Sequence, residues 1–475
     1  MKRVSVALLL CIVIFSSAWA GGGQEKSEPS AEGPITIKIV AKDITDGTEE
    51  NVQHFERMEK AFREATGISV DFEQVPISEG SYAEGLNLLI LGGDIPDLIY
   101  FQGNDQAIAN KGLLEDLTPY IASSPVIQDA MLDFNKKRLA SYPYLLWLAP
   151  PRIRVPVIRS DWYEKAGIEP VTVDEYYAML KKIVESDFDG NGKIDSMGIT
   201  DTGNTTRTDF IFNHAFGVTS TWLKKDGKYV YSRVSEEEKN KLAFYRKLYA
   251  EGILDPEYIT TKWDTMEDKL FSAKVGMIGG TAGLVVDIYE GKMKKSAAGG
   301  KLVALPPAKG VSQGFTIDVT KETRGWAIYA GSKVKKEAWA FLEFMASNEG
   351  QIVDRLGFEG VHHRKEGDKY ILADRFSEWW PRVHEVVEWK SPAPLFGETA
   401  SKSREIGVKY TKEDINFVLP KELATTWDAL NNLYKEYSFN LISGQYSMDA
   451  FDEYVEKWYE IGGDKLTEYA NKVLK

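Results

Sequence analysis

Residues 35–40, with the sequence ITIKIV, alternate apolar and polar side chains, and this spacing predicts a β-strand. A helical stretch of roughly residues 50–65 follows. It ends at Thr66-Gly67, where the glycine suits the position just past a helix. Residues 68–72 then alternate again through Ile68, Val70 and Phe72, which predicts a second strand.

The next part of the chain repeats the order of helix and strand. A predicted helix at about residues 82–91 stops at Gly92-Gly93, and the apolar run 97–101 predicts a third strand. Strands that alternate with helices in this way predict a parallel sheet with right-handed crossovers.

A second group of elements follows the proline-rich passage at residues 149–151. Capping boxes predict two helices, one that begins at Thr172-Val-Asp-Glu175 and one that begins at Ser235-Glu-Glu-Glu238. Residues 274–278 and 301–305 each have a lysine followed by mostly apolar residues, and they predict buried strands.

The end of the chain predicts a helix over residues 447–461 that is closed by Gly462-Gly463. About 440 residues lie beyond the N-terminal segment, which is too long for a single compact core and predicts two lobes. The expected fold class is therefore α/β in two lobes.

The N-terminus has the features of a secretory signal peptide. Lys2 and Arg3 precede an apolar run over residues 4–15, and the small residues Ala18-Trp19-Ala20 supply a cleavage site. We expect cleavage after Ala20, and residues 21–34 have the composition of a flexible tether. Cys11 raises the alternative of a lipid anchor, but it lies within the apolar run. Cleavage after Ala20 would leave a mature chain without cysteine.

The chain carries a formal charge of −13. Such an acidic surface without a basic cluster argues against binding to nucleic acid or to anionic membranes.

Several segments, in order along the chain, resemble the bacterial extracellular solute-binding proteins of family 1, and especially their oligosaccharide- and alginate-binding branch. The segments are 62–70, 91–99, 112–119, 158–168, 187–195 and 271–277. The resemblance implies the type II periplasmic-binding-protein fold, with two α/β lobes, a hinge and a ligand cleft between the lobes.

By this resemblance the N-terminal lobe takes residues 35–150 and 306–348, and the C-terminal lobe takes residues 151–305 and 349–475. The resemblance also implies a non-enzymatic, monomeric receptor at the outer face of the cytoplasmic membrane or in the periplasm. It would deliver a carbohydrate, expected to be an oligosaccharide, to the permease subunits of an ABC importer.

One motif has the spacing of a calcium loop. Asp187, Asp189, Asn191, the Lys193 carbonyl and Asp195 offer oxygen ligands at alternate positions, and Gly192 allows the sharp turn between them. An EF-hand has glutamate at the twelfth position, where this chain has Gly198. The alginate-binding relatives carry an acid at the tenth position, where this chain has Ser196. We expect structural Ca²⁺; the alternative is a solvated acidic turn.

A sugar receptor needs aromatic faces for stacking and planar hydrogen-bonding groups around them. Candidates near the implied hinge, or in irregular stretches, are Trp147, Arg152, Arg154, Trp326, Glu359, His362, Trp379 and Trp380. Each tryptophan has a core position as its alternative, and the arginines have inter-lobe ion pairs as theirs. Arginine at the cleft would suit an acidic sugar.

Two other classes of protein compete with the receptor. A secreted polysaccharide hydrolase needs two carboxylates at a defined distance on either side of the scissile bond. The chain has 71 acidic residues, so its sequence can neither identify nor exclude such a pair. The chain contains no H-E-x-x-H and only five histidines, so it offers few signs of catalysis. A calcium-dependent adhesin would have no evident use for two hinged lobes.

Overall fold

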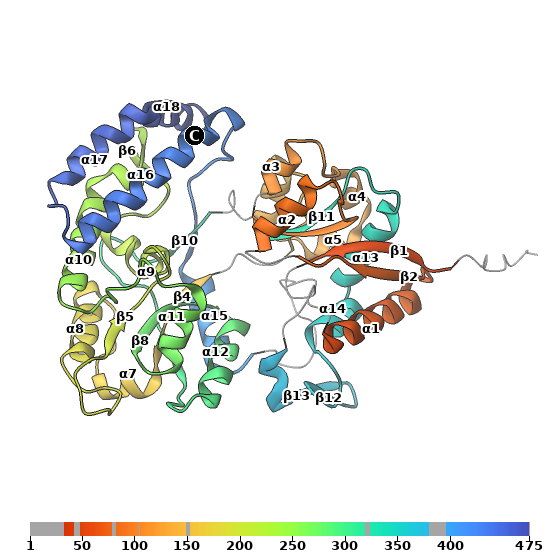
Figure 1. The fold of residues 1–475 in the computed structure, drawn as a ribbon, viewed down its shortest axis with the longest axis horizontal. Coiled ribbons are helices and arrows are strands. Elements are labelled where there is room, and N and C mark those ends of the chain that lie inside the picture. The colour runs from red at the N-terminus through yellow and green to blue at the C-terminus, as the bar shows by residue number, and fades with distance from the viewer. Residues whose placement is uncertain are drawn as a thin grey trace, which may run out of the picture. The chain divides into compact units, whose positions relative to one another are not determined.

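The computed structural model describes residues 33–41, 48–77, 82–103, 105–148, 153–318, 324–379 and 396–474. Residues 35–475 form one compact unit that contains two four-stranded sheets (Figure 1). We call the elements around the first sheet the N-lobe and those around the second sheet the C-lobe. The predicted signal peptide and most of the predicted tether lie outside the described residues.

The N-lobe sheet has the order β11-β3-β1-β2, with β1 (Ile35–Val40), β2 (Val70–Gln74), β3 (Leu98–Gln102) and β11 (Arg324–Ile328). β1 pairs in parallel with both β2 and β3, which confirms the predicted parallel arrangement. β11 comes from far along the chain and pairs antiparallel to β3.

The first helix, α1 (Glu49–Thr66), shows why this sequence folds as it does. Thr48 caps its N-terminus by accepting a hydrogen bond from the Asn51 amide at 3.3 Å. Phe55, Met58 and Phe62 lie on one face of the helix and pack into the N-lobe core. The helix ends at Gly67, whose φ of 76° is the left-handed conformation expected at this position.

The other N-lobe helices cover the same sheet. They are α2 (Tyr82–Leu91), α3 (Asp105–Ala109), α4 (Thr118–Ser123), α5 (Pro125–Ala130), α6 (Asp133–Ser141), α13 (Lys335–Ala346) and α14 (Asn348–Arg355). A hairpin of β12 (His363–Glu366) and β13 (Lys369–Leu372) follows α14 and leads to the short helix η3 (Asp374–Glu378).

The C-lobe sheet has the order β5-β8-β4-β9, with β4 (Arg154–Arg159), β5 (Met197–Ile199), β8 (Val275–Thr281) and β9 (Leu302–Ala304). β5 and β8 are parallel, and β4 runs antiparallel to β8. Its helices include α7 (Ser160–Ala166), α8 (Val173–Val184), α9 (Thr206–Phe212), α10 (Glu236–Ala250), α11 (Trp263–Phe271) and α12 (Leu284–Lys295).

The predicted caps of two C-lobe helices are confirmed. Thr172 and Glu175 form a complete capping box at α8. Ser235 accepts a hydrogen bond from the Glu238 amide at the start of α10.

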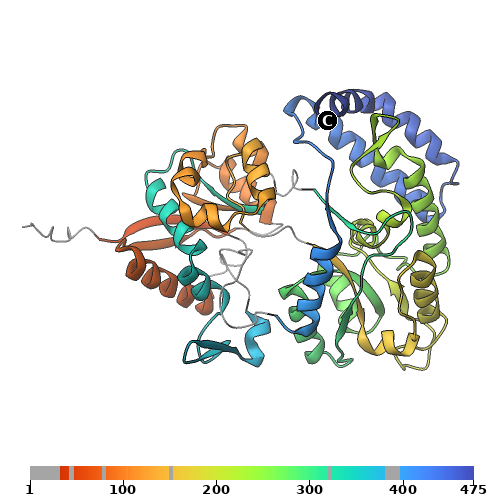
Figure 2. The same ribbon diagram turned by 180° about the vertical axis from the view of Figure 1, so that it is seen from behind.

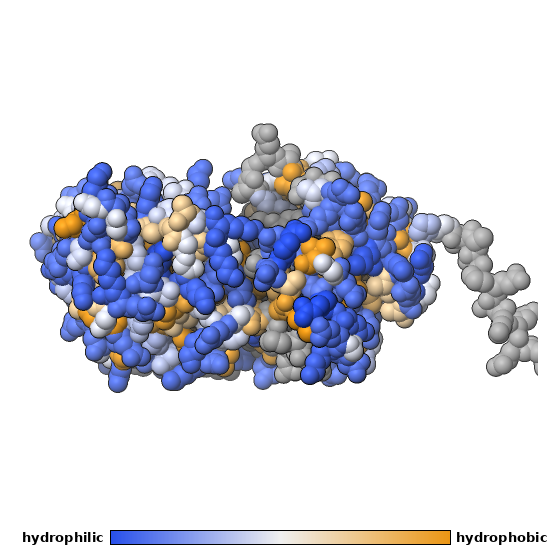
Figure 3. All heavy atoms as spheres, turned by 90° about the horizontal axis from the view of Figure 1, so that it is seen from below, coloured by the Kyte–Doolittle hydropathy of each residue, from blue (hydrophilic) through white to orange (hydrophobic). Residues whose placement is uncertain are grey.

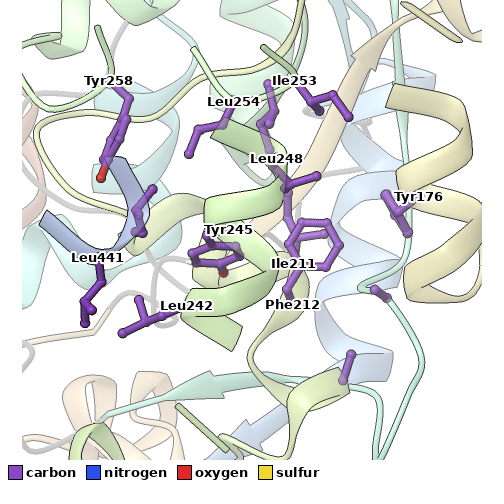
Figure 4. Packing of buried hydrophobic residues seen from close by; sticks show 14 of the residues in the cluster. Tyr176, Ile211, Phe212, Leu242, Tyr245, Leu248, Ile253, Leu254, Tyr258 and Leu441 are labelled. Carbon is purple, nitrogen blue, oxygen red and sulfur yellow. The ribbon is translucent and has the colours of Figure 1, made fainter. Parts of the chain in front are cut away.

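The large C-lobe core joins aromatic and aliphatic side chains from several helices. Tyr176 of α8, Phe212 of α9 and Tyr245 of α10 pack together with Leu441, which belongs to α16 (Ala424–Ser443) (Figure 4). The C-lobe also holds a small hairpin of β6 (Trp222–Lys225) and β7 (Lys228–Tyr231).

The prediction that Gly462-Gly463 closes the last helix is wrong. α17 (Ala450–Trp458) continues through the wide turn Tyr459–Gly463 into α18 (Asp464–Val473). Gly462 has φ of 120°, and a Cβ atom on Gly463 would lie 2.1 Å from the Trp458 ring. The glycine pair therefore permits a kink and a close approach to tryptophan, and the chain resumes a helix beyond it.

Two elements fall on the other side of the lobe boundaries that the resemblance implied. β10 (Phe315–Ile317) pairs with β14 (Thr411–Glu413), and Phe315 packs in a C-lobe core. α14 packs against α1 and α13 of the N-lobe. The N-lobe therefore extends past residue 348, and residues 306–317 lie with the C-lobe.

The face of the molecule in Figure 3 is mostly hydrophilic, with scattered apolar side chains. Within the described ranges, the structure has no helix of the length and hydrophobicity needed to cross a bilayer.

Candidate functional site

One edge of the C-lobe sheet gathers the chain segments that could hold a ligand. The carboxyl ends of β5 and β8 lie there, and the antiparallel pairing brings Arg154, the first residue of β4, opposite Thr281. In open α/β sheets, ligands bind outside the carboxyl ends of the strands. We call this region the C-lobe edge, and it also includes the loop 200–207, Trp263 and the start of α12.

Among the aromatic side chains of the C-lobe edge, Trp263 is the most exposed to solvent. α11 packs against β8 (Figure 1), and Arg207, which lies against the Trp263 ring, is bonded to the Gly279 carbonyl in the second half of β8. Trp263 is 37% exposed, whereas the other described tryptophans are buried or half-buried. The guanidinium carbon of Arg207 lies 3.9 Å from the centre of its ring.

Arg207 is held from both its backbone and its side chain. The buried carboxylate of Asp201 accepts hydrogen bonds from the Arg207 amide at 3.0 Å and the Thr208 amide at 2.8 Å, at the start of α9. Burial raises the pKa of Asp201 to about 6, although these amide hydrogen bonds oppose the rise. The guanidinium donates to the Gly279 carbonyl at 2.5 Å, which fixes it against β8.

A buried ion pair supports the loop that precedes Trp263. Lys269 of α11 donates to Asp255 at 2.7 Å, and Thr200 at the end of β5 donates to the same carboxylate at 2.7 Å. Asp255 and Lys269 are both buried. These contacts join the start of the loop to α11 and β5, so the platform under Trp263 is rigid.

A second part of the C-lobe edge lies on α15 (Glu398–Tyr410), which packs beside β4, β9 and α12 (Figure 2). Its outer side borders a hollow of about 580 Å³, lined by Phe396, Ser401, Arg404, Glu405, Val408 and Lys409. The Gly283 amide donates to Ser403 at 2.8 Å, which ties α15 to the start of α12.

The arginines of this edge lie against aromatic rings. The guanidinium carbon of Arg404 is 5.0 Å from the centre of Phe396, and that of Arg154 is 5.1 Å from the centre of Phe210. Of the residues predicted to bind ligand, the structure therefore places Arg154 at the C-lobe edge. Arg152 and Trp380 lie outside the described residues.

The predicted tryptophans of the N-lobe occupy core positions. Trp147 is buried, and Trp326 of β11 is fully buried beside Tyr100, with ring centres 5.3 Å apart. Neither presents an exposed ring face, so their surroundings favour a packing role over ligand stacking.

Residues 358–379 form a separate cluster in the N-lobe. Trp379 is buried and donates from Nε1 to the Asp354 carbonyl at 2.7 Å. His362 is also buried, 5.1 Å from the Trp379 ring, and accepts a hydrogen bond from the Phe358 amide at 3.0 Å. Burial lowers the pKa of His362. Glu359 is exposed beside this cluster, so of the predicted set only Glu359 faces solvent here.

Sequence analysis missed Trp263 and Arg404. Trp263, Met266 and Leu270 follow the spacing of one helix face, a pattern that predicts a core tryptophan. Arg404 lies in a polar helix of ordinary composition. The usable signal at Trp263 was its place in the first turn of a helix that leads into a strand.

The predicted calcium loop is closed by its own hydrogen bonds. The Asp187 carboxylate accepts from the amides of Gly190, Asn191 and Gly192 at 2.8, 3.1 and 2.9 Å. These contacts, the one from Gly192 above all, lower the pKa of Asp187. The Asn191 side-chain amide donates to Asp189 at 2.7 Å and to Asp195 at 3.0 Å.

The donor set of this loop fits calcium in its chemistry, because the predicted ligands are carboxylate, amide and carbonyl oxygens. Gly190 and Gly192 have φ of 76° and 82°, which allows the tight turn. In the arrangement described, the nitrogen of the Asn191 amide faces the carboxylates. Among the described residues, no three His, Cys, Asp or Glu side chains gather closely enough to hold a metal.

The structure explains the departure from an EF-hand at the twelfth position. Gly198 lies in β5, and a Cβ atom there would be 3.0 Å from Ile253 Cγ2 and 3.1 Å from the Ile253 carbonyl oxygen. A glutamate at this position would require Ile253 to move. At the tenth position Ser196 is buried, and its hydroxyl has no hydrogen-bond partner among the described residues.

Residues 41–352 match the family described as bacterial extracellular solute-binding protein, and the chain belongs to this family. The family resemblance predicted from the sequence is confirmed, as is the two-lobe α/β fold.

The lipoprotein LipO of Bacillus subtilis strain 168 is 24% identical over 100% of this chain and 99% of its own. The polygalacturonan/rhamnogalacturonan-binding protein YtcQ of the same strain is 23% identical over 88% of each chain. The crystal structure of the alginate-binding protein AlgQ2 without calcium ion superposes with a TM-score of 0.69. It shares 18% identity, over 93% of this chain and 98% of that one.

Proposed function

We propose that this protein is the exported receptor of an ABC importer and that it captures an oligosaccharide at the C-lobe edge. The observation that carries the proposal is the half-exposed ring of Trp263 at the carboxyl end of β8, held over Arg207. An aromatic face next to fixed hydrogen-bonding groups is what a sugar ring requires. Closure of the N-lobe over this edge would enclose the ligand.

The names of relatives support the class of ligand. YtcQ is named for binding polygalacturonan and rhamnogalacturonan, and AlgQ2 for binding alginate. The alternative of a secreted polysaccharide hydrolase gains no support, because the family and these relatives are described as binding proteins.

The proposal has consequences for location and partners. Signal peptide cleavage after Ala20 would release a mature chain that begins at Gly21, in the periplasm or at the outer face of the cytoplasmic membrane. The loaded protein would act as a monomer and dock on the permease subunits. We propose neither catalysis nor nucleic-acid binding for it.

We also propose that the loop 187–195 binds calcium as a structural ion. Asp187, Asp189, Asp195, the Lys193 carbonyl and the Asn191 side chain would supply oxygens, once the Asn191 amide turns its oxygen toward the carboxylates. Bound calcium would neutralise the acidic loop and hold the start of β5. The loop lies at the opposite end of β5 from the C-lobe edge, so the ion would not touch the ligand.

The direct test is the thermal stability of the mature chain against a panel of neutral and acidic oligosaccharides, peptides and amino acids, with calcium and with chelator. A ligand at about 100 times its Kd stabilises the folded state by about 2.7 kcal/mol, which raises Tm by several degrees.

A stabilising sugar that is recovered intact after incubation supports the receptor. Consumption of the sugar would instead support a secreted hydrolase. If no sugar of the panel raises Tm, the proposal is contradicted.

A further inference from the structure

Three arginine–aromatic pairs recur along the C-lobe edge. Arg154 lies against Phe210, Arg207 against Trp263 and Arg404 against Phe396, with distances from guanidinium carbon to ring centre of 5.1, 3.9 and 5.0 Å. The three arginines come from different elements, namely β4, α9 and α15, so the repetition does not follow from one local motif.

Each pair combines two kinds of recognition. The aromatic ring offers apolar surface for the C–H face of a sugar. The guanidinium is planar, carries five N–H donors and binds carboxylates with two parallel hydrogen bonds. Contact with a ring restricts the guanidinium, so less conformational entropy is lost when a carboxylate binds.

Several acidic side chains of the same edge accept hydrogen bonds from backbone amides or form ion pairs with lysines. The Asp201 carboxylate accepts backbone amides at the start of α9, and Asp287 of α12 accepts the Gly397 amide at 3.0 Å. Glu267 pairs with Lys292 at 2.9 Å, and Glu405 pairs with Lys402 at 3.1 Å. Asp264, in the first turn of α11, and Glu398, in the first turn of α15, are exposed exceptions.

Two lysines add to the positive charge. Lys262 is exposed directly before Trp263, and Lys409 lines the hollow beside Arg404. The edge thus places Lys262 and Lys409 beside the three arginines, on a chain whose formal charge is −13. An acidic ligand would be repelled by most of the surface and attracted at this edge, which gives selectivity as well as affinity.

We infer that the C-lobe edge selects sugars that carry carboxylates, that is, oligosaccharides of uronic acids. Arg154 and Arg404 are the specificity-determining residues, because both are half-buried at the edge and each lies against an aromatic ring. Arg207 has a positioning role beneath Trp263, since it is buried and bonded to the Gly279 carbonyl. This inference rests on the proposed function.

The experiment compares matched ligands that differ only in charge. Titration calorimetry on the mature protein uses trigalacturonate and trimannuronate, each against its fully methyl-esterified form, with kestose as a neutral control. We expect at least one acid to bind about tenfold or more tightly than its ester, with an affinity that falls as salt is raised.

The variants Arg154→Gln and Arg404→Gln should each weaken binding of the acid about tenfold and leave binding of the ester within about twofold. Arg364→Gln is the matched control, because Arg364 is an exposed arginine on the β12–β13 hairpin that pairs with Glu366. It should change neither affinity. Thermal unfolding of each variant identifies any loss of folding.

Equal affinity for acid and ester, or binding of kestose alone, would overturn the inference and leave the sugar receptor standing. Arg154 and Arg404 variants that bind the acid normally would also overturn it. Failure of every sugar in this set and in the wider panel would contradict the proposed function itself.

Discussion

The guanidinium of Arg207 covers one face of the Trp263 indole at 3.9 Å and also donates to the Gly279 carbonyl, so the indole rests on a cation that is anchored to the C-lobe sheet. Such a stack stabilises the ring orientation by about 0.5–1 kcal/mol at an exposed site and by more where water is excluded. The opposite face of the ring can then receive a ligand without much reordering of the protein.

Trp263→Ala should weaken binding of the preferred sugar about tenfold or more, because the stacking surface is lost. Its effect on Tm should be small, since the indole is partly exposed. Titration calorimetry measures the affinity. Tyr459→Ala is the control, because Tyr459 is 39% exposed on the turn after α17 and should leave the affinity unchanged. Unchanged binding by Trp263→Ala would exclude the platform.

Removal of calcium should lower the Tm of the wild-type protein, and Asp195→Asn should abolish this dependence. Asp195 accepts only from the Asn191 side chain among the hydrogen bonds described above, so the variant removes a proposed calcium ligand and spares the backbone of the loop. Asp187→Asn should instead lower Tm with and without calcium, because Asp187 also holds three backbone amides. A wild-type Tm that is indifferent to chelator would contradict the calcium site.

His214 should make stability depend on pH below neutrality. It is buried between the Ser312 and Thr316 hydroxyls at 3.0 and 2.7 Å, and burial, with Lys412 nearby, lowers its pKa to about 4. Between about pH 4 and 6.5 the unfolded chain binds this proton and the folded chain does not. Its contribution is therefore complete above pH 6.5 and is lost as the pH falls toward 4.

The measurement is urea unfolding of wild type and His214→Gln from pH 4.5 to 7.5. Between these limits the wild type should gain about 2 kcal/mol more than the variant. The difference between the two proteins is the quantity to compare, because burial raises the pKa of Asp105, Asp201 and Asp287 to about 6, and they contribute with the opposite sign. Parallel curves would show that His214 does not titrate as described.

Trp379→Phe separates a structural tryptophan from a ligand-binding one. Phenylalanine keeps most of the ring packing but loses the hydrogen bond to the buried Asp354 carbonyl. We expect a loss of about 1–3 kcal/mol in unfolding free energy and an unchanged sugar affinity. A large loss of affinity at normal stability would return Trp379 to the ligand site.

The local patterns of this sequence predicted its fold well, because the alternation in β1 and β2 and the glycine after α1 report directly on backbone conformation. The predicted pairs of cap residues at Thr172 and Ser235 are likewise local. Local patterns could not predict that β11 joins this sheet as an antiparallel strand. Its partner β3 lies more than 200 residues earlier in the chain.

The candidate site was harder to predict, because it depends on which side chains are exposed to solvent in the folded protein. Trp326 and Trp263 are chemically identical, yet one is fully buried and the other is 37% exposed. Only the packing of distant elements decides this difference. Arg154 was predicted because it lies at the hinge that the family resemblance implied, whereas Arg404 reaches the same edge through the packing of α15 on α12.

The late position of β11 also sets the order in which the polypeptide can mature. The N-lobe sheet lacks its fourth strand until residue 328 has been synthesised, whereas all strands of the C-lobe sheet lie between residues 154 and 304. Until then β3 presents an open edge of unpaired backbone groups, a surface prone to aggregation. The sheet whose first strands are synthesised earliest is therefore the later of the two to gain its last strand.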